Sequence, residues 1–233
     1  MLWFIGWDTR EAAAYDVCVS SLRRHASIPL DIRPLKHRQL RKNKLFWREW
    51  RVDWSGQYWD IADGRPFSTE FSHTRFLVPE LARDSEEEWA FFCDADFVFA
   101  ENPAKLFVEV DRSKALMVVK HRHEPTNTSK MDGVRQTPYP RKNWSSFVAW
   151  NLRHPGNLRL PCEAANTADG SYLHSFGWLD DADIGELNPG WNWLVGHSSP
   201  EIKPLAYHFT DGGPWFEDWA GGPCDEVWLR AAE

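Results

Sequence analysis

Two carboxylates interrupt an apolar run between Trp89 and Phe99, in the stretch WAFFCDADFVF. A run of this composition is typical of a buried strand, where Asp94 and Asp96 would point to the same face. At neutral pH two carboxylates placed so close together repel each other unless a positive charge lies between them. The simplest such charge is a divalent metal ion. The sequence therefore predicts a central strand that leads into a metal site.

The expected strands and helices alternate along the chain. Strands are expected at residues 2–5, 28–35, 89–99, 115–121 and 145–151, and a helix at residues 11–25. This order predicts an α/β fold, with a mainly parallel or mixed sheet flanked by helices. Ligands of such sheets bind beyond the carboxyl ends of the strands, where Asp8, Asp94 and Asp96 would meet. No linker is evident, so we expect a single domain over residues 1–233.

The charge of the chain restricts its partners. A formal net charge of −7 and a pI near 5.7 argue against nucleic acid as a partner. One segment differs, because residues 33–51 contain eight Lys or Arg and a single acid, Glu49. A solvated surface is the commoner explanation of such a segment, and contact with acidic lipid headgroups or an anionic substrate is the functional one.

The remaining composition favours a cytoplasmic protein. No segment approaches the roughly 18 consecutive apolar residues of a membrane-spanning helix, and the N-terminal apolar stretch turns polar after seven residues. The four cysteines lie far apart without a CxxC pair, so we expect reduced thiols. A peripheral contact with the inner face of a membrane, through Arg33 to Arg51, is a secondary hypothesis.

A second candidate segment is HFTDGGPWF, which begins at His208. Its histidine could be a third metal ligand, and the backbone of Gly212 and Gly213 could approach a phosphate closely. A lone histidine beside aromatic residues is more often structural. An isolated DxD motif also has a bland explanation, a pair of capping carboxylates, but the aromatic residues on both sides of Asp94 and Asp96 favour a site.

A third candidate segment is RKNWSSFVAWN. Arg141 and Lys142 could neutralise phosphate, while Ser145, Ser146 and Asn151 could bind sugar hydroxyls. The alternative explanation is a basic turn that enters a strand.

Five motifs, taken in order, resemble a family of bacterial glycosyltransferase-like proteins. More distantly, they are similar to glycosyltransferase family 8, the glycogenin and lipopolysaccharide galactosyltransferase group. The motifs are FSTEFSHTRFLVPEL, WAFFCDADFVF, RKNWSSFVAWN, LHSFGWLDDADIGELNPGWNWLVG and HFTDGGPWF. The resemblance implies a GT-A fold, with a Rossmann-like sheet. It also implies metal-dependent hexosyl transfer from a nucleotide diphosphate sugar, with UDP-sugar favoured, to a glycan or lipid-linked acceptor in cell-surface glycan or glycolipid synthesis.

The resemblance also implies roles for individual residues. Asp94, Asp96 and His208 would bind Mn²⁺ or Mg²⁺. The nucleotide and sugar of the donor would contact Trp7, Asp8, Arg10, Tyr15, Arg75, Asp94, Ala95, Asp96, Ser146, Asn151, His208, Gly212 and Gly213.

Two departures from family 8 are evident. The glutamine that these enzymes commonly carry between two aspartates is replaced by Ala182, between Asp181 and Asp183. The lysine of the family's HxxGxxKPW signature is also absent, because Gly213 precedes the proline. A retaining or inverting outcome therefore stays open, and the acceptor-side base would be Asp180, Asp181 or no residue at all.

Two other classes of function remain. A haloacid-dehalogenase-like phosphatase would use DADFV as its DxDx[TV] motif, although the motif lies far from the first strand and leaves His208 without a role. A non-catalytic carbohydrate-binding protein would use some of the 15 tryptophans, such as Trp191 and Trp193, to stack on sugar rings.

Overall fold

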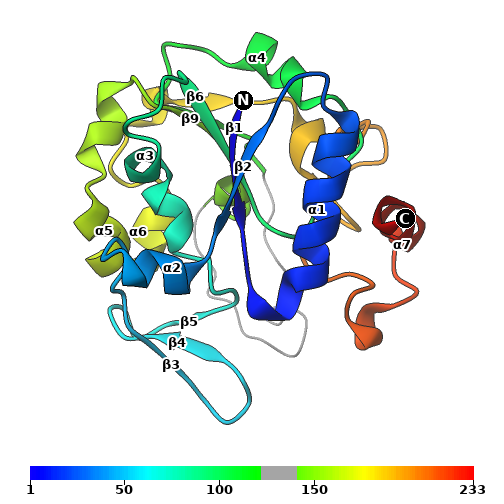
Figure 1. Ribbon diagram of the computed structural model, residues 1–233, viewed down its shortest axis with the longest axis horizontal. Coiled ribbons are helices and arrows are strands. Elements are labelled where there is room, and N and C mark those ends of the chain that lie inside the picture. The colour runs from blue at the N-terminus through cyan, green and yellow to red at the C-terminus, as the bar shows by residue number, and fades with distance from the viewer. Residues whose placement is uncertain (122–140) are drawn as a thin grey trace.

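A six-stranded mixed sheet forms the centre of the computed structural model, which describes residues 1–121 and 141–233 (Figure 1). Its strand order is β10-β8-β9-β6-β1-β2. The strands are β1 (Leu2–Gly6), β2 (Asp31–Leu35), β6 (Trp89–Cys93), β8 (Leu116–Val118), β9 (Phe147–Asn151) and β10 (Ile184–Glu186). β1 is parallel to both β2 and β6, and β10 is parallel to β8, whereas β9 is antiparallel to both of its neighbours. The expected α/β architecture is confirmed.

The two faces of the sheet bury two different apolar cores. Leu2 and Phe4 of β1 point into one core, and Trp3 and Ile5 point into the other. Both faces are apolar because helices cover both of them, which is why the central strands are apolar throughout instead of alternating with polar residues.

Helices lie on both faces. α1 (Ala12–His25) packs on one face beside α7 (Asp225–Ala232), on the right of Figure 1. The other face is covered by α2 (His37–Lys42), α3 (Val78–Leu81), α5 (Cys162–Thr167) and α6 (Gly170–His174), and α4 (Leu106–Glu109) lies at the top. Short 3₁₀ helices are η1 (Thr9–Glu11), η2 (Thr74–Leu77), η3 (Pro103–Lys105), η5 (Trp144–Ser146), η6 (Pro155–Arg159), η7 (Asp181–Asp183), η8 (Pro189–Asn192) and η9 (Glu217–Trp219).

Two small sheets flank the central one. The first has the order β11-β12-β7 and consists of β7 (Phe97–Phe99), β11 (Trp193–Leu194) and β12 (Ala206–His208). The second is antiparallel and consists of β3 (Trp50–Val52), β4 (Tyr58–Asp60) and β5 (Pro66–Phe67).

The prediction of one continuous strand over residues 89–99 is wrong. The chain leaves the central sheet after Cys93 and joins the β11-β12-β7 sheet at Phe97. Between them, the Asp94 amide donates to the carbonyl of Ser146 at 3.0 Å, and the carbonyl of Asp96 accepts from the Phe209 amide at 3.0 Å. The two carboxylates therefore lie where the chain crosses from one sheet to the other, and the crossing brings them beside β12.

Candidate metal and donor site

Asp94, Asp96 and His208 form a compact cluster at this crossing. One potential ligand atom from each residue lies within 4.8 Å of the others, and His208 Nε2 is 3.4 Å from Asp96 Oδ1. The pairing of β12 with β7 brings the histidine there, because His208 is opposite Phe97 and its ring stacks on the Phe97 ring with centroids 4.4 Å apart. Asp96 and His208 are buried, and Asp94 is partly exposed. These are the three residues that the sequence proposes as metal ligands.

Asn192 determines which nitrogen of His208 faces the carboxylates. The Asn192 side-chain amide donates to the carbonyl of Asn143 and the hydroxyl of Ser146, both at 3.0 Å. Its oxygen therefore faces His208 Nδ1, at 2.8 Å. Since an amide oxygen only accepts, Nδ1 carries a proton, so Nε2, which faces Asp96, is the nitrogen left to bind a metal ion. This is the tautomer that a metal-binding histidine needs.

Arg75 supplies a positive charge beside the cluster. Its Nη1 lies 2.8 Å from Asp94 Oδ1 and donates to the carbonyl of Ser145 at 2.8 Å. The guanidinium also packs over the rings of Phe71 and Phe92, so its side chain is buried. Arg75 therefore fixes the position of Asp94 and offsets part of the negative charge of the two carboxylates.

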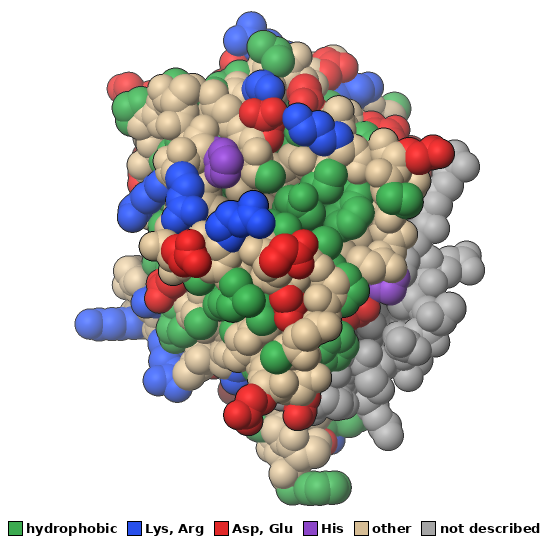
Figure 2. All heavy atoms as spheres, turned by 90° about the vertical axis from the view of Figure 1, so that its right-hand side faces the viewer, with side chains coloured by type: hydrophobic (Ala, Val, Ile, Leu, Met, Phe, Trp, Pro, Cys, Tyr) green, Lys and Arg blue, Asp and Glu red, His purple; other side chains and the backbone are tan. Residues whose placement is uncertain are grey.

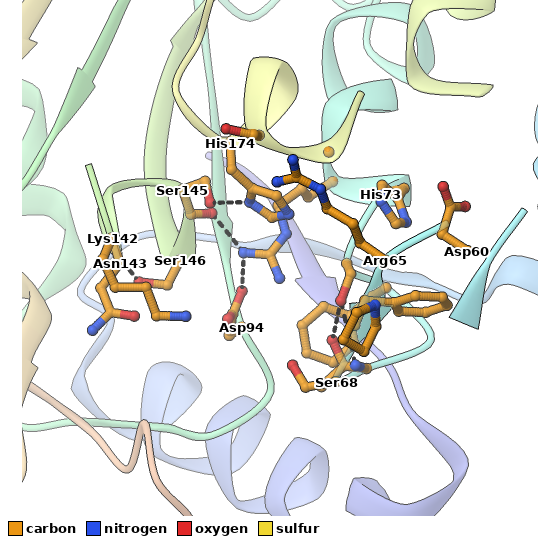
Figure 3. Close-up of a pocket in the computed structure, with 18 of the residues that line it drawn as sticks. Asp60, Arg65, Ser68, His73, Asp94, Lys142, Asn143, Ser145, Ser146 and His174 are labelled. Atoms are coloured by element: carbon orange, nitrogen blue, oxygen red, sulfur yellow. Dashed lines mark hydrogen bonds and ion pairs between the residues drawn. The ribbon is translucent and has the colours of Figure 1, made fainter. Parts of the chain in front are cut away.

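A cavity extends from the cluster toward α6 and the β4–β5 segment. The described residues that line it are Asp60, Asp63, Arg65, Pro66, Phe67, Ser68, Thr69, Phe71, Ser72, His73, Arg75, Asp94, Asp96, Lys142, Asn143, Ser145, Ser146, Gly170, Ser171 and His174. Figure 3 shows Lys142 and Asn143 on one side of Asp94, and His73 and Asp60 on the other.

The α6 side of the cavity offers neutral hydrogen-bonding groups. Ser145 Oγ lies 2.7 Å from His174 Nδ1. Burial, together with the nearby positive charges of Arg75 and Arg48, keeps the pKa of both His73 and His174 well below the usual histidine value. Both imidazoles are therefore uncharged at neutral pH, and uncharged imidazoles and hydroxyls can donate to and accept from sugar hydroxyls.

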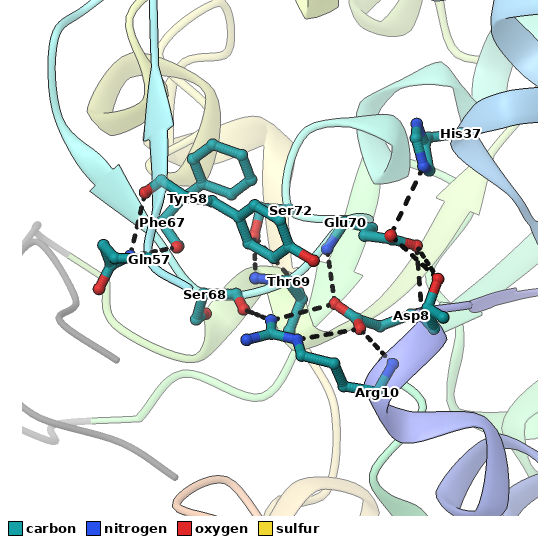
Figure 4. A network of polar contacts seen from close by, with 11 residues as sticks. Asp8, Arg10, His37, Gln57, Tyr58, Phe67, Ser68, Thr69, Glu70 and Ser72 are labelled. Carbon is teal, nitrogen blue, oxygen red and sulfur yellow. Dashed lines mark hydrogen bonds and ion pairs between the residues drawn. The ribbon is translucent and has the colours of Figure 1, made fainter. Parts of the chain in front are cut away.

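Asp8 and Arg10, which the sequence proposes as donor contacts, lie at the expected edge of the sheet, but they form hydrogen bonds with each other (Figure 4). The fully buried Asp8 accepts from the backbone amides of Arg10 and Glu70, both at 2.8 Å, and from the Arg10 guanidinium at 3.3 Å. Arg10 also donates to the carbonyl of Ser68 and packs over the ring of Tyr58. Asp8 and Arg10 thus attach the loop after β1 to the segment after β5.

The two aromatic residues near this loop remain accessible in part. Trp7 is half-buried, and the ammonium of Lys36 lies 4.6 Å from the centre of its ring. Tyr15 is half-buried in α1, and burial raises the pKa of its phenol to about 12, so it stays protonated.

The structure does not bring Asn151, Asp180 or Asp181 to the cluster. Asn151 pairs with Trp89, at the opposite end of β6 from Asp94, and its amide donates to the carbonyls of Arg112 and Lys114. These sequence predictions therefore need correction: neither aspartate nor Asn151 is among the described residues that line the cavity.

The position of the two aspartates follows from the sheet. Asp180 and Asp181 precede β10, which starts beside Leu116 at the edge where β8 begins. Both are exposed, and Asp181 forms an ion pair with Arg141, which also donates to the carbonyl of Ser175 at 2.7 Å. A role as acceptor-side base is therefore not supported for either residue.

The other proposed residues have mixed outcomes. Ala95 is fully buried between the two aspartates, and Ser146 lines the cavity while its hydroxyl donates to the carbonyl of Asn143. Gly212 and Gly213 follow β12, but neither is among the described lining residues. Gly212 needs to be glycine because its φ is +136°, and Gly213 because a Cβ there would lie 2.2 Å from the Trp215 ring.

Sequence reasoning missed the far side of the cavity. Asp60, Asp63 and Arg65 belong to none of the five motifs, and His73 and His174 lie in two of them but were given no role. A three-stranded sheet and α6 bring these residues together. Asn192 was also missed as a partner of His208. Its only signal is its place in NPGWNW, a turn-rich segment that gives no indication of a contact with β12.

Comparison with solved structures identifies the class of the fold. The structure of the glycosyltransferase GlyE of Streptococcus pneumoniae TIGR4 is similar with a TM-score of 0.60 at 14% identity, over 99% of this chain and 59% of that chain. The bifunctional glycosyltransferase WbbM gives 0.57 at 13%, over 99% and 51%, and an LgtC mutant gives 0.56 at 12%, over 100% and 95%. The chain thus spans little more than half of WbbM and GlyE. These similarities confirm the expected GT-A fold.

The family follows from a sequence relative. Protein CDI of Arabidopsis thaliana is 42% identical over 235 residues, which cover 99% of this chain and 85% of the plant protein. No family model matches the chain. The chain belongs to the family of Protein CDI, so the family includes a plant protein.

Proposed function

We propose that this protein is a metal-dependent glycosyltransferase that moves a hexose from a nucleotide diphosphate sugar, most simply a UDP-sugar, to an acceptor hydroxyl. The observation that carries the proposal is the Asp94, Asp96 and His208 cluster, whose two aspartates line a cavity on a GT-A fold. A solved LgtC structure holds donor and acceptor sugar analogues, and that protein has a similar fold. For this chain we propose a glycan or lipid-linked acceptor, a cytoplasmic location and a single catalytic domain.

The cluster fits Mn²⁺ or Mg²⁺. Carboxylate oxygens suit both ions, and a buried imidazole with an available Nε2 lone pair suits Mn²⁺ in particular. When bound, such an ion would act as a Lewis acid on the leaving diphosphate. Asp94, Asp96 and His208 would hold it, and Arg75 keeps Asp94 in position for that role.

In this proposal Lys142 supplies the positive charge that binds the diphosphate of the donor. Lys142 is buried and lines the cavity. It is therefore suited to take the role of the lysine in the family 8 signature, whose position is occupied here by Gly213. Arg141 points away, toward Asp181. Beside Lys142, the side-chain amide nitrogen of Asn143 finds no acceptor in residues 1–121 and 141–233, which leaves it available to donate to the donor substrate.

We assign binding of the hydroxyl groups of the donor sugar to the α6 side of the cavity. Ser145, Ser171 and the uncharged His73 and His174 would hydrogen-bond the sugar and position it for attack by the acceptor. As C1 of the sugar forms its bond to the acceptor oxygen, the bond from C1 to the diphosphate breaks, and the acceptor hydroxyl passes its proton to the departing diphosphate. The remaining negative charge of the diphosphate lies beside Lys142 in this proposal.

The two other functions fit the structure less well. A phosphatase that uses Asp94 as nucleophile would give His208 and Asn192 no role. A binding module that stacks sugars on Trp191 is not supported, because this side chain is fully buried and its Nε1 donates to Glu109.

Thermal unfolding with a panel of nucleoside diphosphates tests the proposal. Each nucleotide is added with and without Mn²⁺, because a ligand that binds only the folded state raises the unfolding temperature. We expect one nucleotide, most simply UDP, to raise this temperature only when Mn²⁺ is present. An equal rise without the metal, or no rise for any nucleotide at millimolar concentration, would contradict the proposal.

Asn192 gives a prediction specific to the metal site. Asn192→Leu removes the acceptor for His208 Nδ1–H, so the imidazole can rotate or change tautomer. We expect the affinity for Mn²⁺, measured as free Mn²⁺ by electron paramagnetic resonance, to fall about 10- to 100-fold.

Asn157→Leu is the matched control. Asn157 is also buried, and its amide likewise donates two hydrogen bonds, to the carbonyls of Ala115 and Asn151, away from the cluster. Both variants should lose about 1–3 kcal/mol of stability. If folded Asn192→Leu binds Mn²⁺ as wild type does, or if Asn157→Leu loses as much affinity, the positioning role of Asn192 is wrong.

A further inference from the structure

The β3–β4 hairpin presents an exposed tryptophan at its tip. The hairpin extends from the lower end of the molecule in Figure 1, and the Trp54 side chain in its turn is 99% exposed. Val52 and Ile61 are each 54% exposed, on the hairpin and directly after it, and Trp47 is 47% exposed. Several exposed apolar side chains in one short part of the fold are typical of a surface that contacts a partner.

The turn is ordered even though its tip is exposed. The Asp53 carboxylate accepts from the Ser55 hydroxyl at 2.6 Å, from Trp59 Nε1 at 2.9 Å, and from the backbone amides of Ser55 and Gln57. These hydrogen bonds lower the pKa of Asp53 to about 2, so it keeps its charge and its bonds at neutral pH. The hairpin therefore presents Trp54 from a fixed turn.

Positive charge is concentrated around this tryptophan. Residues 33–65 carry nine Lys or Arg and four Asp or Glu, a net charge of +5, while the whole chain carries −7, so the remaining residues carry −12. Six of the nine residues are exposed. Arg33 pairs with Asp31 on β2, and the other five lie on the hairpin, on α2 or next to them: Arg38, Lys42, Lys44, Arg51 and Arg65. By contrast, acidic and basic side chains are interspersed on the face in Figure 2.

The same element forms part of the cavity. Asp60 at the end of β4, Arg65, and Phe67 of β5 all line it. A surface that the hairpin contacts would therefore lie close to the site, and a lipid-linked acceptor held in such a surface could reach the cavity.

We propose that the hairpin and α2 dock on a lipid bilayer that contains anionic headgroups. Trp54 enters the headgroup region, where amphipathic aromatic rings are favoured, and the exposed Lys and Arg side chains bind the anionic lipids. The net charge of +5 on this part of an otherwise acidic protein is the argument for an anionic partner, and the exposed apolar tip is the argument for a bilayer.

Flotation with vesicles tests the proposal without any nucleotide or metal, so its outcome is independent of the proposed transferase activity. The vesicles contain phosphatidylcholine alone, or with a quarter of phosphatidylglycerol, at low salt. We expect binding only to the anionic vesicles, loss of binding at high salt, and about tenfold weaker partition for Trp54→Ser. The double variant Lys42→Glu, Lys44→Glu should weaken partition more than tenfold, because each cation near the surface contributes about fivefold.

Val108→Ser is the matched control. Val108 is 87% exposed on α4, at the end of the molecule opposite the hairpin. The proposal is wrong if wild-type protein stays with the soluble fraction in every vesicle mixture, or if Val108→Ser weakens binding as much as Trp54→Ser. It is also wrong if heparin binds the protein more tightly than the vesicles do and Trp54→Ser changes neither affinity.

Discussion

Asp96→Asn is expected to abolish the Mn²⁺-dependent rise in unfolding temperature and to lower sugar transfer more than about 100-fold. The substitution keeps the shape of the side chain but removes one of two carboxylates that lie with His208 Nε2 in a cluster no wider than 4.8 Å. The remaining oxygen is a weak ligand, and the site loses one negative charge. The assays are thermal unfolding with nucleoside diphosphate and Mn²⁺, and turnover of the donor that the nucleotide panel identifies.

The stability of Asp96→Asn without metal distinguishes a loss of metal binding from a failure to fold. Arg75 offsets only part of the charge of Asp94 and Asp96, so the two carboxylates repel each other when no metal ion is bound, and Asp96→Asn in EDTA should be at least as stable as wild type. Asp218→Asn, an exposed carboxylate in η9, is the control and should keep the Mn²⁺-dependent rise. A full Mn²⁺-dependent rise in Asp96→Asn would remove Asp96 from the metal site.

The core of the fold could be predicted from the sequence because both faces of β1 and β6 are apolar. Leu2 to Ile5 and Trp89 to Cys93 are apolar throughout, which is typical of strands covered by helices on both sides. The break after Cys93 could not be predicted in the same way. Phe97 to Phe99 have an equally apolar pattern, and only their partners, β12 instead of β9, place them in another sheet.

The site could be predicted where local sequence determines geometry. Asp94 and Asp96 lie at the carboxyl end of a central strand, as the apolar run before them indicates. His208 was expected from the resemblance, and the pairing of β12 with β7, two segments far apart in the sequence, brings it next to them. Asp180 and Asp181 show the limit of this reasoning. An acidic turn between two strands can lie at either edge of a sheet, and the direction of β10 decides which.

The basic residues of segment 33–51 differ in their burial. Arg38, Lys42 and Lys44 are exposed, whereas Arg48 is almost fully buried. The sequence shows eight similar charges in residues 33–51, but not that one of them has acidic partners in residues 60–63. Contacts between distant segments decide which basic residue is buried, and these contacts cannot be inferred from composition.

Arg48→Met is expected to lower the free energy of unfolding by about 3–5 kcal/mol. Arg48 Nε and Nη2 bind both oxygens of Asp60 at 2.7 Å, Nη1 donates to the carbonyl of Ala168 at 2.7 Å, and Nη2 lies 3.8 Å from Asp63. Methionine fills much of the same volume but leaves the Asp60 carboxylate buried without its cation. Urea denaturation followed by circular dichroism measures the change.

A surface pair of similar geometry provides the control. Arg33 and Asp31 lie 2.6 Å apart, but their side chains are 47% and 54% exposed, compared with 0% and 1% for Arg48 and Asp60. Arg33→Met should therefore cost less than about 1 kcal/mol. Adding Asp60→Asn to Arg48→Met should recover part of the loss, because it removes the unpaired buried charge. If Arg48→Met costs no more than Arg33→Met, the buried pair does not hold β4 to the α5–α6 segment. The Asp63 bond to the Gly170 amide, at 2.9 Å, would then have to hold this wall of the cavity.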